Sequence, residues 1–434
     1  MAVSRKLLFS LESFFPSHRA GTEVYVLNLC HYFKQRGWDV GVLIATSKKL
    51  ADYHYEDIPV YTFDIPERAN AQELNGLIPP RGIEHFTLRI RELQPDIVHF
   101  HSFGRAINSF HLEVVKELGI KTAFTPHLGS FFCIKGDVRL FGHSNCDARV
   151  DKRRCMSCFL KGKGHSKLTA QLLSSSITQI IKLKALKNHV PATLFLAQHR
   201  QQEIERVNQY ADIVFSIAPW IQTAFEINGI TKAQLIPQGI SPVFITSSTI
   251  KQFNDSIKKI HFAFIGRMHP IKGFHLLMQA FSNINPEKAC LHVITIKDRN
   301  ESEYYTKAVN WAKGRTNVIW NENLAPHQIK DYYSKIDCLI QPSVNEVSPL
   351  VSLESLSQKT PILCSNISAF KEQIKEFGGG LLFDKGCHAS LAERMNELIK
   401  SKTLLRQLSK NIKKPCSMME VAAIIEEAYK ALEL

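Results

Sequence analysis

Two stretches of the chain repeat one alternation, in which short apolar runs are followed by segments of helical periodicity. The first stretch begins with the run Lys6–Leu11 and includes Asp96–His101. Helices are predicted after it over Ala106–Leu118 and about Lys167–Lys187. The second restarts the pattern at Ile260–Ile265 and continues with Cys290–Ile296. Strands that alternate with helices form right-handed crossovers and a parallel sheet. The sequence therefore predicts an α/β protein with two doubly wound, Rossmann-like domains, whose ligands bind outside the carboxyl ends of the strands, in a cleft between the two halves.

The length of the chain agrees with this division. A chain of 434 residues is too long for one ordinary domain and fits two of about 200 residues each. The polar, aperiodic segment 242–258 is predicted to be the linker. We therefore expect a first domain over 1–241, with a cysteine-rich insertion at about 128–168. A second domain covers 259–415, and a last helix lies within 416–434.

Composition and charge limit the class of protein. No run of 18 or more apolar residues is present, so we expect no transmembrane helix. The N-terminal segment lacks the long apolar region and cleavage site of a signal peptide, which predicts a cytoplasmic location. The formal net charge of +14 suits a polyanion, an anionic membrane face or a phosphorylated substrate, and does not choose among them.

Two glutamates with seven residues between them, Glu346 and Glu354, follow an apolar strand. Ser348 is a good N-cap and Pro349 a favoured first helical residue, which predicts a helix over Pro349–Gln358. Glu346 then lies in the loop before the helix, and Glu354 lies within the helix.

The start of this predicted helix is a candidate anion site. The free N–H groups of Leu350 and Val351 point back towards the loop, and phosphate is the usual anion at such a place. Two interpretations stay open: a nucleotide-diphosphate site in which the glutamates bind hydroxyl groups, or a strand-loop-helix unit with two solvated glutamates.

A second candidate site is the loop that follows the strand Ile260–Ile265. Gly266 and Arg267 open this loop, and Lys272 and Gly273 end it. Arg267 and Lys272 can converge on one diphosphate, the first as a planar fork and the second as a point charge. Basic loop residues are often only solvated, but the position after the first strand of a domain favours a function.

Two further candidates lie in the first half. Gly21 follows the first strand and allows a ligand to approach a helix start closely. His127 ends the strand that begins at Lys121, where it could bond a substrate or be a structural histidine. His99 and His101 should face the same side of their strand. The glycine-rich signatures of NAD enzymes and P-loop kinases are absent, which disfavours both classes.

Four cysteines form a cluster with the spacing C-x12-C-x8-C-x2-C: Cys133, Cys146, Cys155 and Cys158. Such thiols can hold a structural zinc ion, an iron–sulfur cluster, or no metal at all. Residues 133–167 contain nine Lys or Arg and three Asp, a net charge of +6. This part is a candidate acceptor-binding or membrane-surface lobe. The six other cysteines are predicted to be small core residues.

Together the motifs resemble the retaining glycosyltransferases of the GT-B fold, specifically family 4 (group 1), in the subgroup with a cysteine cluster in the N-terminal domain. Seven ordered matches carry the resemblance: Ala20–Glu23, Pro95–His99, Thr125–His127, Ala211–Val214, Pro237–Gly239, Gly266–Gly273, and Glu346 with Glu354. The sequence departs from the family pattern at Gln238, Val347 and Gln358–Lys359.

The resemblance implies roles for these residues. Arg267 and Lys272 would neutralise the donor diphosphate, with Gly266, Ser348, Leu350 and Val351 around it. Glu346 would bind hydroxyls of the transferred sugar and Glu354 the nucleotide ribose. His127 would contact the donor sugar, and Gly21 would lie against the diphosphate. The donor would be a nucleotide-diphosphate sugar, no catalytic metal is expected, and the last helix would cross back to the first domain.

The resemblance also implies the partners. The acceptor would be a polysaccharide, glycolipid or lipid-linked glycan, made at the inner face of the cytoplasmic membrane with peripheral contact to anionic lipid. No nucleic acid is expected. Two other hypotheses are a GT-B-like sugar-nucleotide epimerase and a nucleic-acid-binding protein that acts through the cysteine lobe as a zinc ribbon.

Overall fold

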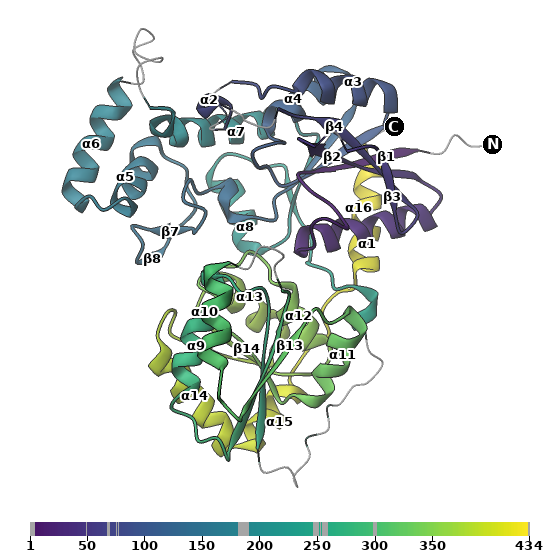
Figure 1. Cartoon of the computed structure of the whole chain (residues 1–434). Helices are drawn as coiled ribbons and strands as arrows, with labels where there is room; N and C mark the ends of the chain where they lie inside the picture. The colour runs from purple at the N-terminus through teal and green to yellow at the C-terminus, as the bar shows by residue number, and fades with distance from the viewer. Residues whose placement is uncertain are drawn as a thin grey trace. The chain divides into compact units, whose positions relative to one another are not determined.

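The computed structural model describes residues 5–48, 50–66, 70–74, 76, 78–180, 191–245, 251, 253, 259–297 and 302–432. The chain forms two compact units (Figure 1). Unit 1 comprises Met1–Pro237 with Met419–Leu434, and unit 2 comprises Gln238–Met418. Much of the predicted linker (residues 246–250, 252 and 254–258) and the end of the helix predicted over Lys167–Lys187 (from residue 181) lie outside the described residues.

Unit 1 is built on an eight-stranded sheet with the order β10-β9-β6-β5-β1-β2-β4-β3. Its strands are β1 (Lys6–Leu11), β2 (Asp39–Thr46), β3 (Tyr53–Tyr55), β4 (Ile58–Asp64), β5 (Ile97–His101), β6 (Lys121–Thr125), β9 (Ile213–Ser216) and β10 (Ala233–Leu235). The strand pairs are parallel except β3–β4. The chain order reverses between β1 and β5, and such a switch point is the usual ligand position in a doubly wound sheet.

The helices of unit 1 connect these strands and add a lobe. They are α1 (Gly21–Gln35), α2 (Ala71–Leu74), α3 (Ile83–Leu93), α4 (Ser109–Glu117), α5 (Lys152–Gly162), α6 (Lys167–Ile180), α7 (Leu196–Tyr210), α8 (Pro219–Ile227) and α16 (Met418–Lys430). The lobe consists of α5, α6 and a two-stranded hairpin, β7 (Arg139–Leu140) with β8 (Ser144–Asn145). The hairpin and α5 lie within the range predicted for the cysteine-rich insertion, about 128–168, whereas α6 extends beyond it to Ile180.

The last helix, α16, packs in unit 1. Glu426 is 4% exposed and accepts hydrogen bonds from Tyr32 (2.9 Å) and Trp38 (3.5 Å). Arg36 lies 3.3 Å from the same carboxylate. Tyr429, which is fully buried, bonds to His99 of β5 at 2.6 Å. Buried polar groups with partners on both sides fix the register of this helix against the sheet.

Unit 2 is a six-stranded parallel sheet with the order β13-β12-β11-β14-β15-β16. Its strands are β11 (Ile260–Ile265), β12 (Ala289–Thr295), β13 (Val318–Glu322), β14 (Cys338–Gln341), β15 (Ile362–Ser365) and β16 (Gly380–Phe383). Its helices are α9 (Phe274–Phe281), α10 (Glu303–Ala312), α11 (Pro326–Lys335), α12 (Leu350–Ser357), α13 (Ser368–Phe377), α14 (His388–Lys400) and α15 (Lys402–Lys410).

Helices cover both faces of the unit 2 sheet, as Figure 1 shows. Phe262 and Phe264 of β11 belong to one core with residues of α9 and α14. Ala263 and Ile265 of the same strand belong to the other core, with residues of α11, α12 and α13. Because side chains alternate along a strand, a strand buried on both faces reads as a continuous apolar run, and this explains the sequence pattern. The expected α/β architecture of two parallel-sheet domains is confirmed.

Several element boundaries differ from the prediction. Helix α4 starts at Ser109, not at Ala106, because the Asn108 side chain accepts a hydrogen bond from the Phe110 N–H at 3.1 Å and caps the helix there. Strand β3 and the β7–β8 hairpin were not predicted. They are only two or three residues long, too short to show a periodic pattern.

Candidate functional site

In unit 2 the loops that follow β11 and β14 lie side by side at the switch point of the sheet. The Val344 N–H donates to the Ile271 carbonyl at 2.8 Å. Gly273 has a φ of +71°, and a Cβ placed there would lie 2.1 Å from the Pro342 carbonyl oxygen. Only glycine allows both this backbone conformation and this approach. The predicted Gly266–Gly273 loop is therefore held against the segment that carries Glu346.

The contact between these loops brings two predicted site residues together. Lys272 Nζ lies 2.6 Å from Glu346 Oε1, although the residues are 74 positions apart in the sequence. The Lys272 side chain is 25% exposed and that of Glu346 is 11% exposed. A lysine and a carboxylate at the carboxyl ends of two adjacent central strands form a polar, partly accessible site where doubly wound sheets bind ligands.

The Gly266–Gly273 loop adds positive charge to this site. Arg267 is exposed, and among the described residues no acidic side chain forms an ion pair with it. Burial lowers the pKa of His269, and the charges of Arg267 and Lys272 lower it further. Two cations that act on one imidazole lie close enough to act together on a bound anion.

Helix α12 begins next to this loop. Its first residue is Leu350, and Pro349 is the N-cap, without a side-chain cap bond. The expectation that Ser348 caps the helix and Pro349 starts it is therefore wrong by one residue. Pro349 adopts an extended φ, ψ of −70°, 121°, which a proline accommodates readily. Leu350 and Val351 still occupy the first turn, where N–H groups lack intrahelical partners.

Glu354 lies in the second turn of α12 and contacts a buried tyrosine. The hydroxyl of Tyr333, from α11, is 3.2 Å from the Val351 carbonyl and 3.4 Å from Glu354 Oε2. Burial raises the pKa of Tyr333 well above its usual value, and the Glu354 charge adds to this rise. The tyrosine therefore stays a neutral donor that orients the carboxylate.

In unit 1, Gly21 is the exposed first residue of α1. The Glu23 side chain, 5% exposed, folds back over this helix end: its Oε2 accepts from the Ala20 N–H at 2.9 Å. Its Oε1 lies 2.9 Å from His18 Nδ1. The free N–H groups of the helix start thus already have one carboxylate partner, which also orders the preceding loop.

His127 belongs to a row of histidines on the unit 1 sheet. Its Nε2 lies 2.9 Å from Nδ1 of His101, and the two rings stack at 5.2 Å. His99 and His101 share one face of β5 and are 0% and 2% exposed. Burial lowers the pKa of His127 to about 3, so the ring is neutral near pH 7. A neutral, partly exposed imidazole can exchange hydrogen bonds with a sugar hydroxyl.

The four cysteines of the cluster gather in the α5–hairpin lobe as free thiols. Cys158 Sγ accepts from the Phe141 N–H at 3.1 Å, and Arg154 lies 3.5 Å from Cys146 Sγ. The pKa of Cys155 is raised to about 11, mainly by burial and in part by Cys146 and Cys133, so these sulfurs are neighbours. In the described part of the chain, no three of the four sulfurs lie within 4.8 Å of one another. A shared metal ion would have to draw them closer together.

A group that sequence reasoning missed lies elsewhere in unit 2. His261, Cys290 and His292 have ligand atoms that all lie within 4.8 Å of one another. Cys290 had been interpreted only as a small core residue. The signal that could have indicated the group is the Cys-x-His pattern of β12, but its third member comes from β11.

The two parallel-sheet units have the fold of the GT-B glycosyltransferases. Sucrose-phosphate synthase from Thermosynechococcus elongatus superposes with a TM-score of 0.67 at 15% identity, over 99% of both chains. The Anabaena protein HepE, solved in complex with UDP and glucose, superposes with a TM-score of 0.64 at 15% identity, over 98% of this chain and 100% of that one.

Two family models match separate parts of the chain. Residues 247–415 match the glycosyl transferases group 1, and residues 19–149 match Glycosyltransferase Family 4. Alpha-maltose-1-phosphate synthase of Mycolicibacterium smegmatis is 26% identical over 181 residues, 40% of this chain and 46% of that protein. Spore coat protein SA of Bacillus subtilis is 28% identical over 155 residues, 34% of this chain and 41% of that protein.

The chain therefore matches less than half the length of these curated relatives. The paired family matches support a family 4, group 1 glycosyltransferase of GT-B type, and favour neither the epimerase nor the nucleic-acid hypothesis.

Proposed function

We propose that the protein is a retaining glycosyltransferase that moves a hexose from a nucleotide-diphosphate sugar to a hydroxyl group of a polysaccharide, glycolipid or lipid-linked acceptor. The observation that carries this proposal is the Lys272–Glu346 contact of 2.6 Å at the switch point of unit 2, beside the start of α12. A cation for phosphate and a carboxylate for sugar hydroxyls then lie in one place.

The leaving diphosphate is the group that most needs stabilisation. Arg267 and Lys272 neutralise its charge, and the Leu350 and Val351 N–H groups donate hydrogen bonds to a phosphate oxygen at the positive end of α12. Gly266 and Ser348 border this anion site. Preorganised charges of this kind are typically the largest contribution to catalysis of a step that creates an anion. On this account the reaction needs no catalytic metal ion.

The transfer step conserves atoms and charge. The bond between the anomeric carbon and the diphosphate oxygen breaks, and a bond from the acceptor oxygen to the same face of that carbon forms. The acceptor proton passes to the departing diphosphate, which leaves as the nucleoside diphosphate. Glu346 accepts hydrogen bonds from hydroxyls of the transferred sugar. These hydrogen bonds replace part of the contact between its carboxylate and Lys272.

The remaining site residues position the donor. Glu354, oriented by Tyr333, binds the nucleotide ribose. Neutral His127 contacts the sugar, and Gly21 lies against the diphosphate. Each role is testable separately, since each residue can be replaced without changing the others.

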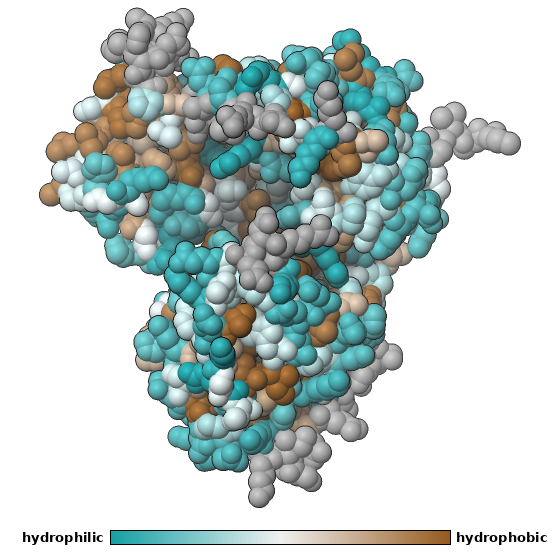
Figure 2. Space-filling model, viewed as in Figure 1, coloured by the Kyte–Doolittle hydropathy of each residue, from teal (hydrophilic) through white to brown (hydrophobic). Residues whose placement is uncertain are grey.

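A peripheral contact with an anionic membrane is part of the proposal. No described helix is long and apolar enough to cross a membrane. Helix α6 exposes Leu168 (75%), Leu172 (71%) and Leu173 (41%) to solvent. Figure 2 shows hydrophobic surface in the region where Figure 1 draws α5 and α6. The segment 133–167, which leads into α6, contains nine Lys or Arg, and positive charge combined with an apolar helix face is what binds anionic lipid surfaces.

A structural zinc ion held by Cys133, Cys146, Cys155 and Cys158 is also proposed. The sulfurs share one lobe, and the Phe141 N–H that reaches Cys158 Sγ is a donor of the kind that supports a bound thiolate. The expected result is that Cys155→Ser lowers the zinc content and the melting temperature of unit 1. Unchanged zinc content would remove this part of the proposal.

The reaction class is tested by the stereochemistry of the product. The protein is incubated with each UDP-, GDP- and ADP-sugar and a panel of sugar and glycolipid acceptors, and the anomeric configuration of the product is determined by NMR. Retention of the donor configuration is expected. Inversion, or release of a free epimerised sugar nucleotide instead of a glycoside, would contradict the proposal.

A further inference from the structure

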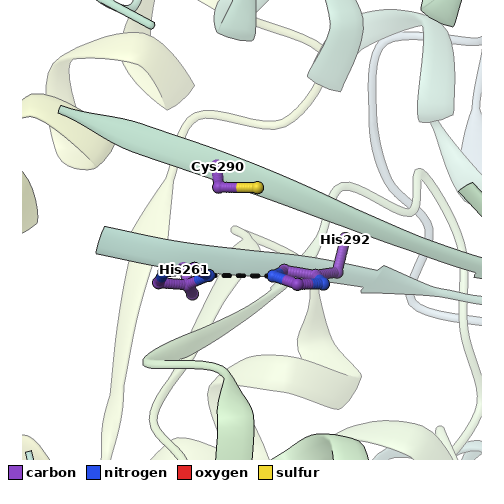
Figure 3. A group of neighbouring side chains, drawn as sticks. All are labelled: His261, Cys290 and His292. Carbon is purple, nitrogen blue, oxygen red and sulfur yellow. Dashed lines mark hydrogen bonds between the residues drawn. The ribbon is translucent and has the colours of Figure 1, made fainter. Parts of the chain in front are cut away.

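Three side chains with metal-binding atoms converge on two adjacent strands in unit 2. In the parallel pair β11–β12, His261 lies opposite Cys290, and Ala263 lies opposite His292. Residues opposite each other in a parallel sheet, and residues two apart on one strand, point to the same face. His261, Cys290 and His292 therefore share one face of the sheet, and Figure 3 shows them grouped across the two strands.

The distances between these side chains are close to those of a metal site. His261 Nδ1 and His292 Nε2 are 2.9 Å apart, and the chosen ligand atoms of all three residues lie within 4.8 Å of one another. In a tetrahedral zinc site, with Zn–N of about 2.0–2.1 Å and Zn–S of about 2.3 Å, ligand atoms lie roughly 3.3–3.7 Å apart.

The backbone around the group is rigid. The His261 N–H donates to Asp337 Oδ2 at 2.8 Å, and the Asp337 N–H donates to the His261 carbonyl at 2.7 Å. Such paired bonds hold the start of β11 in place. A preorganised backbone favours binding because little conformational entropy is lost when the ligand atoms are fixed.

One nitrogen of the group is buried without a partner. His292 is 7% exposed, and among the described residues its Nδ1 forms no hydrogen bond. The ligand atom in the proposed site is the other nitrogen, Nε2, which lies 2.9 Å from His261 Nδ1. Neutral imidazole is the form that binds metal ions.

We propose that His261, Cys290 and His292 form a binding site for a zinc-type transition-metal ion, with a water molecule as the fourth ligand on the side where His261 reaches the surface. Two imidazoles and one thiolate are a ligand set that zinc accepts. On binding, the Cys290 thiol loses its proton to solvent. The proton shared between His261 Nδ1 and His292 Nε2 moves to the other nitrogen of the ring that carries it, and each of the two freed nitrogens bonds to the metal.

The position of this site separates it from the donor site. His261 and Cys290 are the second residues of β11 and β12, and His292 is the middle residue of β12, whereas Gly266–Gly273 follows the carboxyl end of β11. The ion would therefore link β11 and β12 and would not take part in sugar transfer. The inference does not rest on the proposed function.

The charged groups around the site limit its affinity. Lys259 acts on Cys290, and Lys335 acts on His292, and both are positive. Asp337 opposes them through its carboxylate beside His261. A thiolate ligand cancels one charge of a dication, which reduces the repulsion from the two lysines. The site therefore prefers an ion that binds thiolate strongly. It disfavours Mg²⁺ and Ca²⁺, which prefer oxygen ligands.

The test is the zinc content of the full-length protein after loading with ZnCl₂ and removal of free ion. Cys290→Ser and His292→Asn are compared with Cys387→Ser. Cys387 is a free cysteine of the same unit whose sulfur caps α14, a position that serine fills well. The cysteine lobe is intact in all three variants, so its contribution cancels.

Cys290→Ser and His292→Asn are expected to bind one zinc ion per chain fewer than Cys387→Ser and wild type. If either core variant is misfolded by circular dichroism, His261→Asn at the partly exposed position takes its place. Cobalt-loaded wild type should also gain a sulfur-to-cobalt absorption band that is weaker in Cys290→Ser. Equal zinc content in all variants, or wild type without zinc beyond that bound by the cysteine lobe, would overturn the inference.

Discussion

Replacing Glu346 by glutamine removes one charge from the proposed site and keeps the shape of the side chain. The carboxylate is 11% exposed and lies 2.6 Å from Lys272 Nζ. A hydrogen bond to a charged group contributes about 1.5–3 kcal/mol. If Glu346 makes such a bond to the transferred sugar in the transition state, its loss lowers turnover about 10- to 150-fold, since 1.36 kcal/mol is a factor of ten.

The same change should affect stability much less. The ion pair is partly exposed, so its loss costs about 1 kcal/mol or less. For a unit the size of Gln238–Met418 this corresponds to a fall of about 2–4 °C in melting temperature. Turnover is followed as nucleoside diphosphate released per chain at saturating donor, and unfolding by calorimetry, so the two effects are separated.

A matched control uses another glutamate–lysine pair of the same unit. Glu303 and Lys307 of α10 lie 2.5 Å apart, with side chains 83% and 56% exposed. Glu303→Gln should leave turnover at the wild-type level. If Glu346→Gln turns over within threefold of wild type, or if Glu303→Gln is equally impaired, the assignment of Glu346 to the sugar site is wrong.

Three further predictions concern other parts of the chain. Gly273→Ala should lower the melting temperature of unit 2 by several degrees more than Gly314→Ala, since both have positive φ but only Gly273 meets a backbone oxygen. The pKa of buried His111 is lowered to about 3, so stability is lost as pH falls below about 6.5. When the pH is lowered from 6.5 to 5, the free energy of unfolding of His111→Phe, measured with urea, should fall by about 2 kcal/mol less than that of wild type. Leu168→Ser with Leu172→Ser should weaken cosedimentation with anionic vesicles while turnover on a soluble acceptor is retained; unchanged sedimentation would refute the membrane contact.

The sheets could be predicted from sequence because their central strands are buried on both faces. Lys6–Leu11 and Ile260–Ile265 were expected and are found with the same bounds. Each is a continuous apolar run next to a turn, a pattern that few other structures produce. The sequence-based prediction started α4 at Ala106 and not at Ser109, although its N-cap residue, Asn108, is present in the sequence.

The contacts of the site could not be predicted in the same way. The loops that carry Lys272 and Glu346 meet because β11 pairs with β14, a neighbour that follows β13 in the chain. The sequence indicated the two residues but not their distance. His261, Cys290 and His292 were missed because strand register, which no local pattern records, places them together.

Binding of a sugar nucleotide tests the central claim most directly. Unfolding of the wild-type protein is followed by calorimetry with saturating UDP-, GDP- or ADP-sugars, and with Lys272→Met as the comparison. At 100 times the dissociation constant a ligand stabilises the folded state by about 2.7 kcal/mol. For a unit of this size, we expect one donor to raise the melting temperature of wild type by roughly 5–11 °C. Lys272→Met should respond much less. A folded wild-type protein that none of these donors stabilises would contradict the account.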